Sequence, residues 1–405
     1  MDDTFYRFPH PEFSSDYVVP EPVAPPPGMW WLVYADVVVL IIALFAVFHF
    51  AFRRRSRRGL AGVTAGSLLY FGFLRRGCVC AVGSLQNVAL GLADPGYGIP
   101  LNVLLFFLVP LLAALFAGRL FCGGVCPLGA LQDLVHIKPL RVPSAAAHAL
   151  GFVPVLFLGT AATAAALRAD FLICRYDPFV AFFRFMGPWP IVLFGIGLVG
   201  IGIFVFRPYC RFLCPYGVLL SWCSRLSFRH VTISPKPRQD CVDCTLCEKS
   251  CPADAIVPPG KSGGTRDQGV QRIILTLVML PLVVGAFGFA GYQARGALAM
   301  IHPDVRLARR IVLEEQNPGL EMTLESEAFR ESGISMAELF ARAYLVESRF
   351  GPAGAILGLF AGIVLMGRFL FYGVERKEET YTIDRGHCFS CGRCFAYCPH
   401  NYVEQ

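Results

Sequence analysis

The stretch Cys241-Val-Asp-Cys244-Thr-Leu-Cys247-Glu-Lys-Ser-Cys251-Pro252 has a second copy near the end of the chain, Cys388-Phe-Ser-Cys391-Gly-Arg-Cys394-Phe-Ala-Tyr-Cys398-Pro399. Both copies read C-x2-C-x2-C-x3-C-P, a spacing that binds [4Fe–4S] clusters. In that arrangement three cysteines of one motif share a cluster with the last cysteine of the other. The spacing therefore predicts two crossed sets of ligands: Cys241, Cys244, Cys247 and Cys398 for cluster 1, and Cys388, Cys391, Cys394 and Cys251 for cluster 2.

The composition indicates a membrane protein built from several apolar helices. Of the 405 residues, 55% are hydrophobic and only 16% are charged, and the mean hydropathy is +0.54. That balance is typical of polytopic membrane proteins. The net charge of +7 is modest and the arginines cluster beside apolar stretches, so they indicate topology and not nucleic-acid binding. Most of the 16 cysteines stand in ligand spacings, which favours metal binding over disulfides.

The first apolar run predicts the orientation of the chain. Residues 29–52 are long enough to span a bilayer, and the basic run Arg53-Arg54-Arg55-Ser56-Arg57-Arg58 follows directly. Because basic residues are retained on the cytoplasmic side, we expect the N-terminus outside. We predict a polytopic, multi-pass α-helical protein of the bacterial inner (cytoplasmic) membrane with about seven transmembrane helices. These cover residues 29–52, 60–75, 102–118, 148–168, 190–206, 273–293 and 353–373.

This topology places both cysteine motifs in the cytoplasm, where they would form one split 2[4Fe–4S] ferredoxin-like domain. Arginine positions and cysteine spacing are independent arguments, and they agree. The predicted organisation is a periplasmic tail at 1–28, five transmembrane helices with cysteine loops at 29–206, a cytoplasmic segment at 207–272, a transmembrane helix at 273–293, a periplasmic helical cap at 295–350, a last transmembrane helix at 353–373 and a cytoplasmic end at 374–405.

Two further cysteine pairs end predicted membrane helices at the cytoplasmic interface. Cys122-Gly-Gly-Val-Cys126-Pro127 and Cys210-Arg-Phe-Leu-Cys214-Pro215 both read C-x3-C-P, and both continue as x-G-x-L. Four thiolates on two like elements suit a third Fe–S cluster, with Cys122, Cys126, Cys210 and Cys214 as ligands. The alternative is a pair of packing turns in which cysteine only fills space.

The order of membrane helix, cysteine loop, membrane helix and C-x3-C-P occurs in 60–135 and again in 148–225, which indicates an internal repeat. The repeat places Cys78, Cys80 and Cys174 near the periplasmic face. These three thiols would hold a further redox centre with a fourth ligand such as Asp177, form a disulfide, or be inert, and the sequence leaves these alternatives open.

The C-x3-C-P turns followed by ferredoxin motifs resemble the membrane polyferredoxins of the NosR and NapH group over about residues 60–400. The similar segments are GCVCAVGSLQN (77–87), ICRYDPFVAFFR (173–184), HPDVRLARRI (302–311) and CFSCGRCFAYCP (388–399). The resemblance implies an electron carrier, since NosR serves nitrous oxide reductase and NapH is a quinol-dehydrogenase subunit serving periplasmic nitrate reductase. NosR carries a large periplasmic flavin domain, for which residues 1–28 leave no room, so we expect a separate redox partner.

We therefore expect an electron-transfer component of a membrane oxidoreductase complex, surrounded by membrane lipid. Electrons would pass between cytoplasmic ferredoxin, flavodoxin or quinol and a periplasmic flavoprotein, cytochrome or copper protein. In one alternative the chain is itself a quinol dehydrogenase, marked by an apolar cleft near a cluster with His136 or Asp177 at its mouth. In the other it is a redox- or iron-responsive assembly or sensor protein, whose clusters would be isolated from one another.

Overall fold

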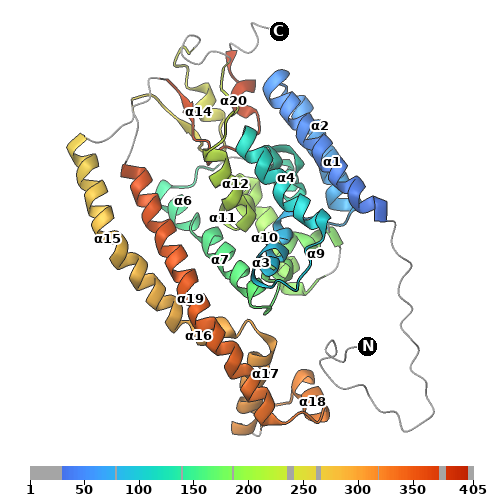
Figure 1. The fold of residues 1–405 in the computed structure, drawn as a ribbon. Coiled ribbons are helices and arrows are strands. Elements are labelled where there is room, and N and C mark those ends of the chain that lie inside the picture. Colours follow the sequence, from blue (N-terminus) through green and yellow to red (C-terminus); the bar gives the residue numbers. More distant parts are fainter. Residues whose placement is uncertain are drawn as a thin grey trace.

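The computed structural model describes residues 30–77, 80–137, 140–184, 187–234, 241–260, 266–317, 319–373 and 380–399. Within these ranges the chain is mostly helical, with one two-stranded sheet. The expected tail at 1–28 and Cys78 lie outside the described residues. A bundle of helices forms the centre of the molecule, and α15 and α19 run beside it as a long pair (Figure 1).

The bundle consists of two successive sets of elements with similar order. The first set is α1 (Trp30–Phe48), η2 (His49–Arg53), α2 (Arg57–Ser67), η3 (Leu68–Leu74), α3 (Ala81–Ala93), α4 (Leu101–Ala117), η4 (Phe121–Val125) and α5 (Pro127–Val135). The second set is α6 (Ser144–Leu150), α7 (Val153–Ala166), α8 (Leu172–Tyr176), α9 (Pro178–Arg184), α10 (Trp189–Phe204), α11 (Pro208–Phe212) and α12 (Pro215–Arg225). In both sets an apolar helix leads to a cysteine turn and then to a helix that begins with proline.

Four helices in the described part of the chain are long and apolar enough to cross a membrane. They comprise Tyr34–Arg53, Ala145–Ala166, Ile273–Gln293 and Met336–Leu370, and shorter apolar helices cover Ala81–Ala93, Leu101–Ala117 and Trp189–Phe204. The predicted helix at 60–75 falls on α2 and η3, which are not among them. The total of seven and the cytoplasmic placement therefore stay predictions.

Helices α15 (Arg266–Gln293) and α19 (Met336–Gly373) pack through glycine. A Cβ added at Gly291 would lie 2.0 Å from the carbonyl oxygen of Gly354, and one at Gly358 would lie 2.0 Å from that of Phe287. Only glycine permits this approach of the two backbones, as in small-xxx-small helix pairs of membrane proteins. The pair is therefore held at a fixed register along its length.

At one end of this pair lies a group of helices, α16 (Arg295–Ala299), α17 (Pro303–Gln316) and α18 (Leu324–Glu331) (Figure 1). Glu314 of α17 accepts hydrogen bonds from Arg310 and Ser326, which fixes α18 against α17. The expected cap at 295–350 and helix at 353–373 are not separate elements, because α19 runs without a break from Met336 through Pro352 to Gly373. A Cβ added at Gly351 would lie 3.0 Å from the ring of Tyr292, so α19 is packed closely on α15 there, and this packing supports the helix through its proline.

Asp36, a carboxylate within an apolar helix, is held by partners in η3 and the turn after it. Its side chain accepts from Tyr70 Oη at 3.0 Å and from Arg75 at 2.7 Å, and it is 1% exposed. Such a pair satisfies a charge that would be costly if left alone in an apolar environment. The interaction fixes α1 against the end of η3.

Replacement of Asp36 by alanine is expected to lower the free energy of unfolding by about 3 kcal/mol, because it leaves the partly buried Arg75 without its carboxylate. The Asp36→Asn variant retains an acceptor for Tyr70 and should lose less. Thermal unfolding of the purified protein in detergent measures the loss of stability in both variants. Equal melting temperatures for wild type and Asp36→Ala would contradict this role.

Candidate iron–sulfur sites

The two cysteine motifs, far apart in the sequence, form one unit at the end of the molecule opposite α17 and α18 (Figure 1). The unit contains α14 (Leu246–Ser250), β1 (Ile256–Val257), β2 (Thr382–Ile383) and α20 (Arg393–Ala396). Strands β1 and β2 pair antiparallel, with Ile256 opposite Ile383, so each half contributes one strand. This pairing joins the halves directly.

The cysteines of this unit line two small cavities in the grouping that their spacing predicts. One cavity is lined by Cys241, Cys244, Cys247 and Cys398, and the other by Cys251, Cys388, Cys391 and Cys394. The loops that connect successive cysteines contain residues with left-handed backbone, including Thr245 (φ 60°) and Ser390 (φ 53°). Such conformations are costly for residues other than glycine. Their presence here indicates that the loops are held in a strained shape around the two cavities.

The donor set of both cavities fits an iron–sulfur cluster. Burial raises the pKa of the Cys388 thiol to about 12 and that of Cys247 to about 11. Thiolates at these positions need a compensating positive charge, which bound iron supplies. The ligand assignments themselves stay predictions.

The four cysteines of the C-x3-C-P turns meet next to this unit, and we call them the membrane-interface site after the location that the sequence predicts for them. Cys214 lies close enough to Cys210, Cys122 and Cys126 for their charges to interact, and all four side chains are buried. Cys126 and Cys214 are the N-caps of α5 and α12, because the proline that follows each of them is tolerated in the first helical turn. Backbone N–H groups at a helix N-terminus favour negative charge on these sulfurs.

Two buried arginines, Arg119 and Arg207, link the membrane-interface site to the ferredoxin-like unit. Each stands three residues before the first cysteine of its turn. Arg119 lies 3.9 Å from Cys122 Sγ and donates to the carbonyl oxygen of Gly386. Arg207 is 0% exposed, donates to the carbonyl oxygen of Cys122 and is near Cys391. Their positive charges therefore face thiols of both sites.

The ring of Phe389, between Cys388 and Cys391, packs against both arginines, with the Arg119 guanidinium carbon 4.1 Å from its centroid and that of Arg207 at 5.6 Å. Its backbone also approaches the cysteine turn: a Cβ added at Gly123 would lie 2.5 Å from the Phe389 carbonyl oxygen. Glycine at position 123 is thus required for the contact between the two sites.

Replacement of Gly123 by alanine is expected to push the loop at Phe389 outward and to lower the free energy of unfolding by about 1–3 kcal/mol, because the clash is with backbone and cannot be relieved by a rotamer change. Gly62 in α2 is the matched control, since a Cβ there meets nothing within 4 Å. Thermal unfolding should separate the two variants. A Gly123→Ala protein as stable as Gly62→Ala would refute the tight contact.

The remaining predicted residues, Cys80, Cys174 and Asp177, also come together. Cys80 lies close enough to Asp177 and Cys174 for their charges to interact. The three residues line a cavity of about 340 Å³, and its other charged lining residues are Asp36, Arg75 and Arg184. Among the described residues no disulfide joins Cys80 to Cys174, and the redox centre expected here stays a prediction. Cys78 lies outside the described residues.

The two glutamines that support these sites were not among the residues predicted from the sequence. Gln132 donates to Cys210 Sγ at 3.3 Å and accepts from Tyr209 N, while Gln86 donates to Cys174 Sγ at 3.4 Å and accepts from Ile173 N. The available signal was the shared pattern C-x2-G-x-L-Q after Cys80 and Cys126. Both glutamines are 0% exposed.

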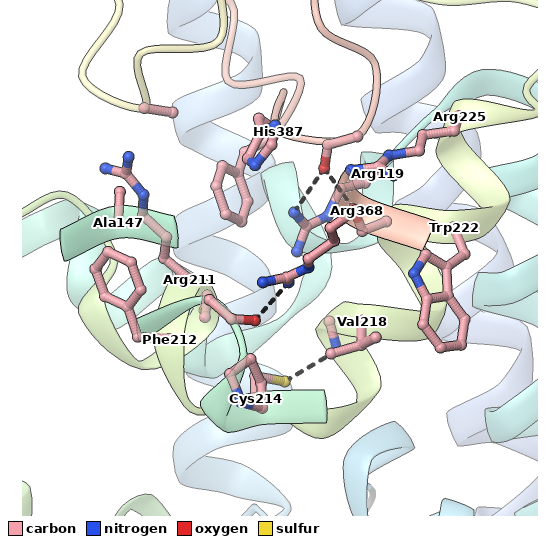
Figure 2. Close-up of a pocket in the computed structure, with 18 of the residues that line it drawn as sticks. Arg119, Ala147, Arg211, Phe212, Cys214, Val218, Trp222, Arg225, Arg368 and His387 are labelled. Carbon is pink, nitrogen blue, oxygen red and sulfur yellow. Dashed lines mark hydrogen bonds between the residues drawn. The ribbon is translucent and has the colours of Figure 1, made fainter. Parts of the chain in front are cut away.

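A cavity of about 380 Å³ opens beside the membrane-interface site (Figure 2). It touches Cys210 and Cys214 and has apolar walls that include Val218 and Val364. Its charged lining among the described residues is cationic, and Figure 2 shows the arginine side chains converging on it from different elements: Arg119, Arg211, Arg225 and Arg368.

Asp384 lies next to this cavity, and its Oδ2 is 2.6 Å from Nδ1 of His387, which lines the cavity. Burial raises the pKa of the Asp384 carboxyl, but the hydrogen bond from His387 outweighs burial and keeps that pKa below its usual value.

Comparison with known proteins agrees with this geometry. Residues 99–141 and 186–234, which contain both C-x3-C-P turns, match the family described as "4Fe-4S binding domain". The protein NirI of Paracoccus denitrificans is 30% identical over 55% of this chain and 35% of its own length. The regulatory protein NosR of Pseudomonas aeruginosa is 31% identical over 55% of this chain and 33% of its own length.

The putative electron transport protein YccM of Escherichia coli is 26% identical over 35% of this chain and 43% of its own length. No solved structure matches the chain. The chain spans about a third of the length of the NirI and NosR relatives.

Apolar helices, paired cysteine turns and split ferredoxin motifs define a membrane-associated iron–sulfur protein of the electron-transport class. Within this class, the chain is similar to the NosR/NapH-like membrane polyferredoxins, as its matches to NirI and NosR indicate.

Proposed function

We propose that this protein carries electrons through a line of iron–sulfur centres between the cytoplasmic and periplasmic sides of the bacterial inner membrane. The ferredoxin-like unit would hold clusters 1 and 2, and the membrane-interface site would hold a third cluster. Iron–sulfur groups supply one-electron chemistry when bound, and a carrier needs several because about 30 Å of hydrocarbon is too wide for one step.

The observation that carries this proposal is that side chains connect the sites without a gap. Phe389 contacts Arg119 and Arg207, which adjoin Cys122. On the far side, the ring of Tyr209, next to Cys210, lies 5.1 Å from the ring of Phe179, two residues after Asp177. Contiguous sites support electron transfer and count against a sensor whose clusters are isolated.

The partners follow from the location of the two ends. A cytoplasmic ferredoxin or flavodoxin, or quinol from the bilayer, would exchange electrons at one end, and a periplasmic flavoprotein, cytochrome or copper protein at the other. The relative YccM, whose name describes an electron transport protein, supports a role in such an exchange.

Cysteine replacement tests the crossed ligand assignment. The Cys398→Ala variant should lose the iron held by Cys241, Cys244 and Cys247, so that adding Cys241→Ala removes no more. Adding Cys388→Ala to Cys398→Ala should remove the iron of both clusters. Iron content per chain and EPR spectra of the anaerobically purified protein give the result.

Cys223, outside all proposed sites, is the control, and Cys223→Ala should keep full iron. The assignment fails if Cys398→Ala and Cys388→Ala lose the iron of the same cluster. The third cluster fails if Cys122→Ala retains all the iron of the wild type.

A second candidate function is quinol oxidation by the chain itself, favoured by the cavity beside Cys210 and Cys214 (Figure 2). The cavity combines apolar walls with N–H donors such as Arg368, and quinone sites need both. His136 and Asp177, expected at the mouth of such a cleft, do not line it, and Asp177 lines the cavity at Cys80 instead.

Gly367 lines this cavity, and a Cβ there meets nothing within 4 Å, so Gly367→Leu should fill the cavity without a clash in the backbone. We expect anaerobic reduction of the clusters by menadiol to slow about tenfold or more, which corresponds to about 1.4 kcal/mol. Gly66→Leu is the control, because Gly66 also has open space but lies on α2. Unchanged reduction of the Gly367→Leu protein excludes quinol oxidation in this cavity.

A further inference from the structure

We propose that Cys80, Cys174 and Asp177 are ligands of a further iron–sulfur centre, in which a carboxylate stands where the membrane-interface site has Cys214. This inference rests on the proposed electron-transfer function and identifies the kind of centre at its far end. It is carried by the correspondence between the two sites, residue by residue.

The first correspondence is the pair of buried glutamines. Each glutamine lies six residues after a cysteine, donates its amide to the sulfur of a cysteine in the second set of helices, and accepts from the backbone N–H of the residue before that cysteine. The sulfur contacts are 3.4 Å for Gln86 and Cys174, and 3.3 Å for Gln132 and Cys210. An amide fixed in this way orients the sulfur and stabilises negative charge on it, as supporting hydrogen bonds do at iron–sulfur centres.

The second correspondence is the position of the capping cysteine. Cys80 is the N-cap of the 13-residue helix α3, as Cys126 is the N-cap of α5. The backbone N–H three residues later points at the sulfur in each case, from Gly83 to Cys80 and from Gly129 to Cys126. Both sites therefore hold one sulfur at a helix N-terminus and one sulfur against a glutamine amide.

The third correspondence concerns Asp177. Asp177 precedes Pro178 as Cys214 precedes Pro215, and each follows the glutamine-bound cysteine of its site. Asp177 is 5% exposed and lies near Cys80. Its Oδ1 accepts a hydrogen bond from the backbone N–H of Phe179 at 3.0 Å, which fixes the orientation of the carboxylate. Asp177 thus places a buried carboxylate in the cavity that Cys80 and Cys174 line together with Arg75 and Arg184.

The dimensions favour a cluster over a single ion. No three His, Cys, Asp or Glu side chains within the described ranges approach closely enough for one metal ion, and this holds for the ferredoxin motifs as well. Thiols that surround a cubane stand further apart than the ligands of one ion. The cavity of about 340 Å³ at Cys80, Cys174 and Asp177 leaves room for such a group.

The experiment replaces Asp177 in the full-length protein, purified without oxygen in detergent. Asp177→Ala should lose the iron of one centre while clusters 1 and 2 keep their EPR signals. Asp177→Cys, which restores the all-cysteine set, should retain that iron and change its EPR spectrum, because a sulfur ligand replaces an oxygen. Asp170→Ala is the control, since Asp170 is a nearby carboxylate that pairs with Arg175.

Gln86→Leu should shift the oxidised-to-reduced ratio of the same centre at least tenfold at a fixed potential, equal to 59 mV for one electron, without removing iron. If Asp177→Ala keeps the iron content of the wild type while Cys122→Ala loses iron, this inference is wrong and the proposed function is unaffected. Unchanged iron in both variants overturns the proposed function. If Asp177→Ala fails to fold, a folded Asp177→Cys protein with an unaltered spectrum also overturns the inference.

Discussion

The close contact between α15 and α19 is the constraint on which the rest of the structure depends. The first cysteine motif precedes α15 and the second follows α19, so the halves of the ferredoxin-like unit meet only if both helices emerge together. The backbone approach at Gly291 and Gly354 fixes their register, and α16 to α18 join them at the far end (Figure 1). The pairing of β1 with β2 then closes the unit. A helix contact that involves no cysteine thus controls the geometry of the cysteine sites.

Local spacing made some of this predictable from the sequence. The grouping of cysteines around two cavities follows from C-x2-C-x2-C-x3-C-P, and the N-cap position of Cys126 follows from Pro127, because these signals lie within a few residues of the atoms they position. The continuity of α19 was not predictable, since Pro352 normally ends a helix and only packing against α15 keeps it helical.

The residues that support the sites were harder to predict for a related reason. Gln86, Gln132 and Arg207 act on partners more than 75 residues away in the sequence, and a single polar residue beside an apolar stretch gives no local signal of its partner. Only a comparison of the two cysteine loops of the first set reveals the glutamines, because the pattern C-x2-G-x-L-Q occurs once in each of them. Repetition within a chain therefore carries information that periodicity and composition do not.

Buried thiolates and clusters carry negative charge, and an apolar bundle holds them only if that charge is balanced. At the membrane-interface site Arg119 and Arg207 supply the balance, together with the N-termini of α5 and α12. At Cys80 and Cys174 the cavity is lined by Arg75, which is paired with Asp36, and by Arg184. The same glutamine contact is present at both sites and cannot distinguish them. A difference in electron affinity between the two sites would therefore arise from their charged side chains: Arg119 and Arg207 at one site, and Asp177, Arg75 and Arg184 at the other.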